Sequence, residues 1–169
     1  MSAAPLAPVA GGWCTFVVAG RLCGIEVTRV QEVLRAAAIT PLPLAPPAVR
    51  GLLNLRGRIV PAVDLRRVLE LPPAPAGAAC GHLIVFDGGS PVSLVVDAIG
   101  DVRRADAAPV LPVPHTLDGP ARDLVAGTVP LADGLLLVLD LDRTLDRAFA
   151  EPDALHAPGR DPRPAGGDS

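Results

Sequence analysis

The chain has 169 residues, a net charge of −3 at pH 7 and a hydrophobic fraction of 50%. A chain of this length is expected to form one domain that buries roughly 70% of its extended surface, so it is globular rather than disordered. The slight negative charge offers no broad basic face for phosphates, which excludes nucleic acid as an expected partner. All 15 basic residues are arginine, so the chemistry of a Schiff-base or P-loop lysine is also excluded.

Cysteine usage and the length of the apolar runs predict a cytoplasmic protein without disulfides. Cys14, Cys23 and Cys80 are odd in number, lack CxxC spacing and follow no secretory leader pattern, which is typical of a reducing compartment. The longest apolar runs, such as residues 134–141, are too short to cross a bilayer. We therefore expect no direct membrane insertion.

The N-terminal part of the chain predicts an arm, a hairpin and a short helix. Residues 1–12 are rich in Ala, Pro and Gly and are predicted to be a flexible arm. Residues 13–26 contain two β-rich runs on either side of a Gly-Arg turn, which is typical of a hairpin. In residues 28–34, apolar side chains recur at i, i+3 and i+4 with Thr28 in front of them. This spacing predicts one or two helical turns with Thr28 as the N-cap.

The middle of the chain alternates between extended and turn-forming segments. Residues 39–47 are rich in proline and are predicted to form an edge strand followed by a loop. In residues 51–64, two apolar runs are joined by an Arg-Gly-Arg turn, which predicts a second pair of strands. Asp64 then precedes a short helical pattern at 65–71 as a candidate N-cap. Residues 72–81 are predicted to be a mobile loop.

The C-terminal part predicts two more hairpins and a final helix. Residues 82–100 form two β-rich runs around an Asp-Gly-Gly turn, and 124–141 repeat the pattern around Asp-Gly. A proline-broken passage at 109–123 separates them. Residues 141–150 predict a helix, and 150–169 a flexible tail. So many short strands predict an all-β sandwich or barrel with about three short helices, and the long crossover helices of a parallel βαβ sheet are missing.

Three aspartates directly follow apolar runs, at Asp64, Asp97 and Asp140. One hypothesis is that they form an acid/base or metal set. The interpretation that we favour is that each accepts backbone N–H hydrogen bonds at a turn or helix start.

Other patterns of catalytic residues are missing from the sequence. His82, His115 and His156 lie far apart, and none forms an HxxxH or HExxH motif. Folding could bring His82 and His115 together with Cys80, although a lone histidine near a strand end is usually on the surface. The chain has neither a GxSxG elbow nor a glycine pattern that holds phosphates. We therefore predict a binding protein rather than an enzyme, with no cofactor and no metal.

Polar residues on otherwise apolar elements identify a candidate binding surface. They are Glu32, Arg56 and Arg58. Glu32 and Arg56 could pair, and a partly exposed pair contributes only about 0 to 1 kcal/mol to stability. Arg56 also stands in a turn, where Gly, Asn and Asp are favoured, so a contact role explains it better than turn formation. Two simply solvated charges are the alternative.

Three motifs resemble the CheW family of chemotaxis coupling proteins. They are VTRVQEV at 27–33, GLLNLRGRIVPAVDLR at 51–66 and VVDAIGDV at 95–102. Their order and spacing also agree with the family, and the resemblance covers about residues 13–145.

The resemblance implies a fold and a function. The fold is two packed, SH3-like, five-stranded β-barrels, which fits a folded domain at 13–149 between the arm and the tail. The implied function is that of a non-catalytic adaptor between the cytoplasmic tip of a methyl-accepting chemotaxis receptor and the regulatory domain of a CheA-type histidine kinase. Such a protein would be cytoplasmic and recruited to membrane-attached receptor arrays.

The resemblance also implies two contact surfaces. The receptor is expected to contact a groove between the barrels that is lined by Val30, Glu32, Asn54, Arg56 and Val102, with the valines as its apolar floor and the charged residues as its rim. Ile39 and Leu42 are the candidate kinase contacts, because exposed apolar residues on an edge strand suit packing against another barrel.

Two alternatives remain open at this point. A CheW-like adaptor could serve a receptor and kinase of a non-flagellar pathway, such as surface motility or biofilm control. An enzyme built on the three aspartates would require their carboxylates to converge in one pocket.

Overall fold

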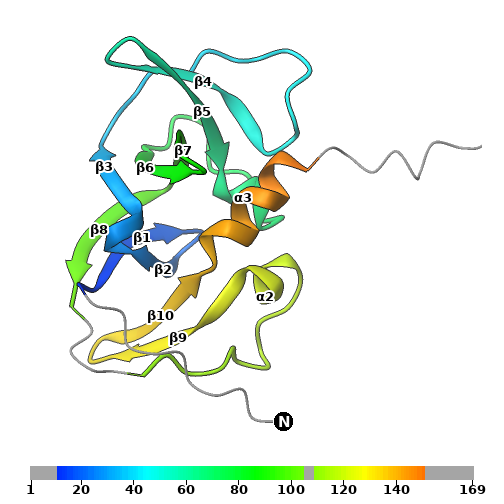
Figure 1. The fold of residues 1–169 in the computed structure, drawn as a ribbon. Helices are drawn as coiled ribbons and strands as arrows, with labels where there is room; N and C mark the ends of the chain where they lie inside the picture. Colours follow the sequence, from blue (N-terminus) through cyan, green and yellow to red (C-terminus); the bar gives the residue numbers. More distant parts are fainter. Residues whose placement is uncertain (1–10, 105–108, 151–169) are drawn as a thin grey trace, which may run out of the picture.

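The computed structural model describes residues 11–104 and 109–150, and its strands form two five-stranded sheets, drawn one above the other in Figure 1. The first sheet has the order β8 (Ala98–Arg103), β1 (Trp13–Val18), β2 (Arg21–Glu26), β10 (Gly134–Leu139), β9 (Val125–Leu131). The second has the order β3 (Val30–Leu34), β6 (Gly81–Asp87), β7 (Ser90–Val96), β5 (Arg58–Asp64), β4 (Val49–Leu55).

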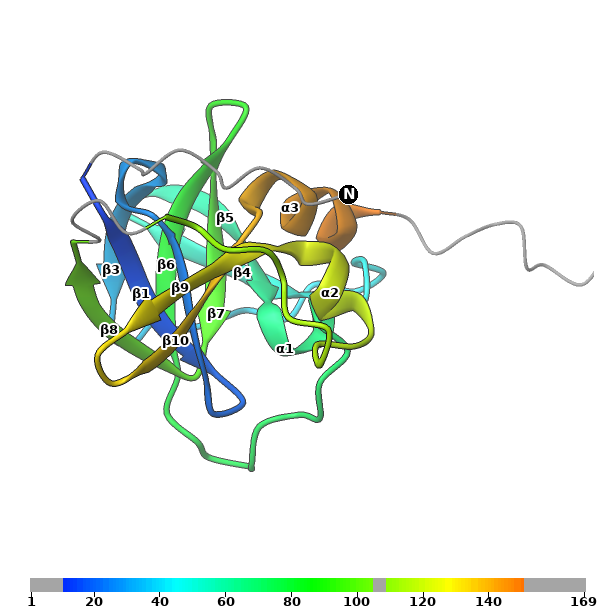
Figure 2. The same ribbon diagram turned by 90° about the horizontal axis from the view of Figure 1, so that it is seen from below.

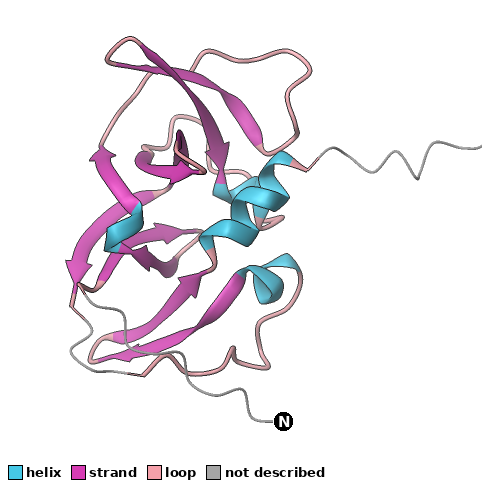
Figure 3. Cartoon of the chain, viewed as in Figure 1, coloured by secondary structure: helices cyan, strands magenta, loops and turns pink. Residues whose placement is uncertain are grey.

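Three short helical segments lie between strands and a fourth follows the last strand. They are the 3₁₀ turn η1 (Val27–Arg29), α1 (Leu65–Val68), α2 (Pro120–Leu124) and α3 (Leu141–Phe149). The three α-helices lie on one side of the sheets and η1 lies on the other, as Figure 3 shows by colour. The edge strands β3 and β8 are on the same side as η1 in both Figure 1 and Figure 2.

The two halves of the chain each contain five strands followed by an α-helix. β1 to β5 lead into α1, and β6 to β10 lead into α3. Each half gives a hairpin to one sheet and its remaining three strands to the other. The halves meet through four strand pairs, of which β2–β10 and β5–β7 are parallel and β1–β8 and β3–β6 are antiparallel. The pairings within each half are all antiparallel. The sheets are therefore built jointly by both halves.

The largest buried apolar cluster joins the two sheets. It contains Phe16 and Ile25 of the first sheet, Leu83 and Leu94 of the second, and Leu145 of α3. Burying one such side chain stabilises the fold by about 1.5–3 kcal/mol. Apolar packing, rather than hydrogen bonding, therefore holds the sheets against each other. Smaller clusters lie around Trp13 and Leu136 in the first sheet and around Leu53 and Val60 in the second.

The predicted fold class is confirmed. The protein is mostly β, with two five-stranded units and a few short helices. The four predicted hairpins are present as β1–β2, β4–β5, β6–β7 and β9–β10. Among the described residues, the two end strands of a sheet do not pair with each other, so each unit is an open sheet at the level of hydrogen bonds.

The helix predicted for residues 28–34 is wrong. Only residues 27–29 are helical, and Val30–Leu34 form β3, in which Val30 lies opposite Val85 of β6. Thr28 is inside the 3₁₀ turn rather than at its N-cap. The exposed and half-buried side chains alternate along β3, as expected for a strand with one face on a core. Pairing with a distant strand thus overrides a spacing that fits a helix equally well.

Two other predictions need correction. Residues 39–47 do not form an edge strand, because Thr40 makes a single bridge to Leu52 and the rest of the segment is loop. β8 and α2 were not predicted as separate elements. The arm at 1–12 and the tail at 150–169 lie outside the described residues except for Gly11, Gly12 and Ala150, so their flexibility stays a prediction.

Candidate functional site

Glu32 and Arg56, which are 24 positions apart in the sequence, meet at the surface of the second sheet. The Arg56 guanidinium donates from Nη2 to Glu32 Oε2 at 2.7 Å. The Arg56 side chain is 74% exposed and that of Glu32 is 19% exposed. The other carboxylate oxygen, Glu32 Oε1, is buried and has no hydrogen-bond partner among the described residues. The pair therefore presents an exposed cation held over a largely covered carboxylate.

The turn between β4 and β5 fixes the position of Arg56. Arg56 and Gly57 have φ angles of 51° and 83°, and positive φ at both central residues is typical of a type I′ hairpin turn. Asn54 Oδ1 accepts a hydrogen bond from the Gly57 backbone N–H at 2.8 Å. Asn54, predicted as a receptor contact, thus shapes the turn that carries Arg56, and its side chain is exposed as well.

The two valines predicted for the same surface lie on edge strands of different sheets. Val30 begins β3 and packs against the main core cluster, and a register shift separates it from Glu32 in the pairing of β3 with β6. Val102 is on β8 and is 56% exposed. β3 and β8 lie on one side of the molecule (Figure 2). The structure thus brings Glu32 and Arg56 into contact and places both valines on that side.

The two predicted kinase contacts differ in exposure. Ile39 is half-buried against the apolar cluster of the second sheet, and Leu42 is 43% exposed in the loop that follows. Leu44, in the same loop, is fully exposed and has a φ of 61°, which is a strained conformation for leucine. The backbone of this segment passes so close to β4 that a Cβ on Gly51 would collide with the Thr40 carbonyl oxygen.

The hypothesis that Asp64, Asp97 and Asp140 form one catalytic site is wrong. Asp64 caps α1 by accepting from the Arg66 N–H at 2.9 Å, and Asp140 caps α3 by accepting from the Arg143 N–H at 3.1 Å. Asp97 accepts from the Ala19 N–H at 2.7 Å. The interpretation as capping and turn residues is therefore confirmed. Within residues 11–104 and 109–150, no three His, Cys, Asp or Glu side chains are grouped as metal ligands would be.

Two ion pairs at equivalent places in the two halves tie a helix to a strand junction. Arg66 of α1 binds Asp97, between β7 and β8, through Nε at 2.8 Å and Nη2 at 2.6 Å. Asp142 of α3 binds Arg29, between β2 and β3, at 2.7 Å. The arginine lowers the pKa of the carboxyl in each pair, because its hydrogen bond stabilises the charged form. The helix supplies the arginine in the first pair and the aspartate in the second, so the charges of helix and strand junction are exchanged.

A family model described as a CheW-like domain matches residues 13–149, from the start of β1 to the end of α3. This chain belongs to the CheW-like family. The matched range coincides with the predicted domain and covers both candidate surfaces.

The relatives of this CheW-like protein include proteins that are named for chemotaxis. The chemotaxis protein CheW of Treponema pallidum is 27% identical over 133 residues, which are 76% of this chain and 78% of that protein. Protein FrzA of Myxococcus xanthus is 33% identical over 102 residues, 60% of this chain and 64% of FrzA. The crystal structure of the scaffolding protein TtCheW from Thermoanaerobacter tengcongensis matches with a TM-score of 0.68 at 25% identity, over 82% of this chain and 92% of that one.

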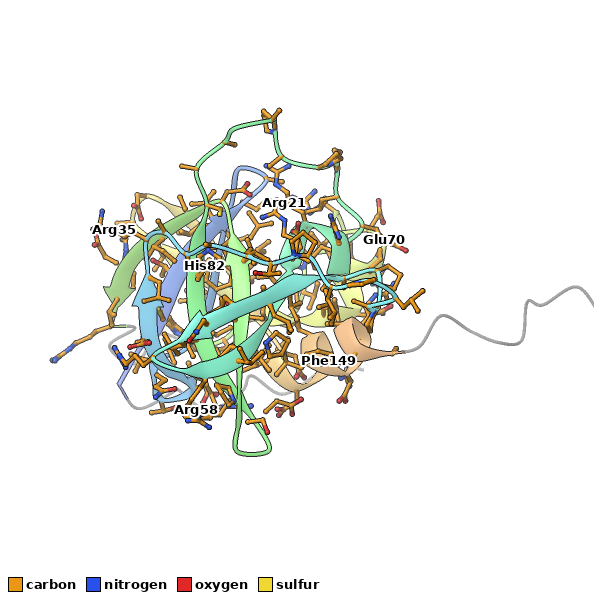
Figure 4. All side chains as sticks on the ribbon, turned by 90° about the horizontal axis from the view of Figure 1, so that it is seen from above. Arg21, Arg35, Arg58, Glu70, His82 and Phe149 are labelled. Atoms are coloured by element: carbon orange, nitrogen blue, oxygen red, sulfur yellow. The ribbon has the colours of Figure 1, made fainter. Side chains whose placement is uncertain are left out.

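The CheW-like domain also contains a buried polar group that the sequence did not predict. His82 of β6 is fully buried, in contrast to the expected surface position, and is labelled in Figure 4. It lies beside Cys80 and Ser93, whereas His115 is exposed in the segment before α2 and His156 is outside the described residues. The alternation of side chains along β6 assigns residue 82 to one face of the sheet, but it does not predict which face is covered.

None of the described helices is long and apolar enough to span a membrane.

Proposed function

We propose that this CheW-like protein is a non-catalytic adaptor that couples the cytoplasmic tip of chemoreceptors to the regulatory domain of a CheA-type histidine kinase. The observation that carries the proposal is the family match across residues 13–149, together with relatives that are named chemotaxis proteins or a scaffolding protein. An adaptor acts by binding and shifts the populations of kinase states, so it needs no catalytic group of its own. In this role the protein works in the cytoplasm, at membrane-attached receptor arrays, without a cofactor.

The proposed receptor surface consists of Val30, Glu32, Asn54, Arg56 and Val102. The exposed Arg56 guanidinium has most of its donors free for an acceptor on the receptor, because one nitrogen binds Glu32. Val102 supplies an exposed apolar contact on the same side of the molecule. A helical receptor tip that buries apolar residues and pairs its polar groups at the rim matches this combination.

The proposed kinase surface is the segment that contains Ile39 and Leu42. Leu42 and its neighbour Leu44 expose apolar side chains next to the edge strand β4. Exposed apolar groups beside a sheet edge are suited to packing against a second β domain. Ile39 fixes the start of this segment to the second sheet, because its side chain packs on the apolar cluster of that sheet.

The experiment that tests the kinase contact is calorimetric titration of the full chain with the isolated regulatory domain of a CheA-type kinase from the same genome. The variant Leu42→Asp is expected to weaken binding at least about 10-fold, since it places a charge in an apolar contact. Leu135→Asp is the matched control, because Leu135 is also 43% exposed but lies on β10 of the other sheet. Equal affinities of both variants would refute the assigned surface, and no binding by the wild type would refute the adaptor role. The double variant Ile39→Asp/Leu42→Asp is less informative, because Ile39 is half-buried.

A second candidate function is an adaptor for a non-flagellar receptor and kinase. The similarity to FrzA favours it, at 33% identity over 102 residues. Titration with kinase regulatory domains from each signalling system of the genome would distinguish the two functions. Preference for a kinase that is encoded with a non-flagellar receptor would support this second candidate.

A further inference from the structure

Cys80, His82 and Ser93 form a chain of contacts at one end of the second sheet. The Cys80 sulfur lies 3.9 Å from His82 Nε2, and Ser93 Oγ lies 3.1 Å from His82 Nδ1. His82 and Ser93 are fully buried on the neighbouring strands β6 and β7, whereas Cys80 is only partly covered. A thiol that faces one imidazole nitrogen while a hydroxyl orients the other is the arrangement of an activated nucleophile.

The thiol is accessible to small molecules. Cys80 is the last residue before β6 and follows the exposed loop at 72–79, which arches over the top of Figure 4 above His82. It lines a cavity of about 170 Å³, which is large enough for a peroxide or a small electrophile. The cavity wall also contains two arginines and two aspartates, namely Arg50, Asp64, Arg66 and Asp97.

These four charged residues compensate one another. Arg50 lies 3.4 Å from Asp64, and Arg66 lies 2.6 Å from Asp97. Neither arginine is therefore dedicated to the sulfur. The group that can take the thiol proton is His82, whose Nε2 faces no other polar atom of the described residues within hydrogen-bonding distance.

His82 is suited to act as a base at neutral pH. Burial lowers the pKa of the imidazole below 6.5, and the nearby Arg50 lowers it further. The ring is therefore neutral in the physiological range. If Nδ1–H donates to Ser93 Oγ, Nε2 carries the lone pair and points to the thiol, and we assign this tautomer from the contacts.

We infer that Cys80 is a modification site, a thiol that His82 activates for oxidation by hydrogen peroxide or an organic hydroperoxide. The sulfur attacks one peroxide oxygen, so that the S–O bond forms while the O–O bond breaks. His82 Nε2 accepts the thiol proton and passes it to the departing hydroxide or alkoxide, which leaves as water or alcohol. The sulfur is oxidised by two electrons to a sulfenic acid, and the peroxide is reduced by the same two electrons.

Cys14 and Cys23 are built-in controls. Both are buried in the core, and burial raises the pKa of both thiols, that of Cys23 to about 12. Because the chain contains no lysine, trypsin separates the three cysteines into peptides 1–21, 22–29 and 68–103. Each thiol can thus be followed by mass spectrometry in the same sample.

The test treats the full-length protein with hydrogen peroxide, traps sulfenic acid with dimedone and measures adduct formation in each peptide between pH 6 and 8. Wild-type Cys80 is expected to react at least about 10-fold faster than Cys14 and Cys23. Its rate should fall much less than tenfold between pH 8 and pH 7, because the lowered pKa of His82 keeps the ring neutral there. A thiol without a base loses about 10-fold in rate for each pH unit below its pKa.

Two variants separate base assistance from simple exposure. His82→Gln should lower the Cys80 rate about 10-fold or more at pH 6.5 and restore the steep pH dependence, since a positioned base contributes roughly 10²–10⁴-fold in enzymes. Ser93→Ala should steepen the pH profile less, because it removes only the group that orients the ring. Cys80→Ser should remove the adduct from peptide 68–103.

Each outcome bears on the inference. An unchanged rate and pH profile in His82→Gln, with Cys14 and Cys23 still protected, would overturn it. If His82→Gln instead exposes the core cysteines, the test relies on the pH profiles of the wild type and of Ser93→Ala. A tenfold fall in the Cys80 oxidation rate of the wild type for each pH unit would then overturn the role of His82 as a base. The result is independent of the adaptor function, since no partner takes part in the assay.

Discussion

Exchanging Glu32 and Arg56 would distinguish the effect of their ion pair from the effect of the charge that is exposed at the surface. In the double variant Glu32→Arg/Arg56→Glu, the two side chains can still pair between β3 and the β4–β5 turn. The exposed member of the pair, however, is now an anion. If Arg56 is a receptor contact, the exchange leaves the fold intact and abolishes receptor coupling.

The structure sets the expected size of the stability change. The Arg56 side chain is 74% exposed, and an exposed ion pair contributes about 0–1 kcal/mol to the free energy of unfolding. For a domain of this size, 1 kcal/mol shifts the melting temperature by about 2–4 °C. Arg56→Ala should therefore melt within about 4 °C of the wild type. The exchanged variant should lose more, because it places an arginine at position 32, where the native side chain is only 19% exposed.

The assay measures co-sedimentation of the variants with receptor cytoplasmic fragments and a CheA-type kinase, and kinase activity in the pellet. We expect Arg56→Ala and the exchanged variant to lose at least about 10-fold in apparent affinity, which corresponds to about 1.4 kcal/mol. Recovery of coupling in the exchanged variant would refute the contact role, because pairing alone would then be sufficient. A fall in the melting temperature of Arg56→Ala far beyond 4 °C would instead assign Arg56 to the fold.

Three further predictions concern stability. The pKa of Asp97 is lowered below 3.8, so its ion pair stabilises the protein above about pH 4 and is lost as the pH falls through the lowered value. In Asp97→Asn, the free energy of unfolding should therefore fall less steeply as the pH is lowered into the acid range. Gly51→Ala should destabilise more than Gly57→Ala, because a Cβ at 51 collides with backbone whereas one at 57 meets open space and costs about 1–2 kcal/mol in conformation. Leu136→Ala should cost about 2–5 kcal/mol, measured by the fluorescence of Trp13, the single tryptophan.

Urea unfolding at several pH values measures all three effects. Parallel acid limbs for the wild type and Asp97→Asn would contradict the ion-pair explanation. Equal losses in the two glycine variants would show that the 39–47 segment moves away from β4 at little cost. A loss below about 1 kcal/mol for Leu136→Ala would mean that the cluster around Trp13 collapses to fill the space.

Local sequence patterns were sufficient for the hairpins and for the two helix caps. The turns that join their strands contain or directly precede a Gly, whose conformational freedom marks them clearly, and Asp64 and Asp140 stand where a capping side chain is needed. Long-range pairing was not predictable in the same way. β3 has the apolar spacing of a helix and becomes a strand because β6, about 50 residues later, offers it an edge.

The candidate site also combines features that local sequence patterns predict with features that depend on long-range pairing. The motif around Arg56 was recognisable because it is contiguous, and its pairing with Glu32 could be proposed from charge alone. The pairing of His82 with Ser93 depends on the register between β6 and β7, and burial of His82 depends on which face of the sheet is covered. Neither of these features is encoded in a local pattern, so the sequence indicated a surface histidine.

The exchange of strands between the two halves has a consequence for how the protein can be divided. The loop at 70–80 joins them, and each half leaves a hairpin in one sheet and three strands in the other. We expect a chain cleaved in this loop to stay assembled, because the strand pairs and the core cluster are shared across the cut. Conversely, each fragment alone lacks the strands that complete its sheets. The domain is thus suited to fragment complementation, in which two separately expressed fragments fold only when they bind each other.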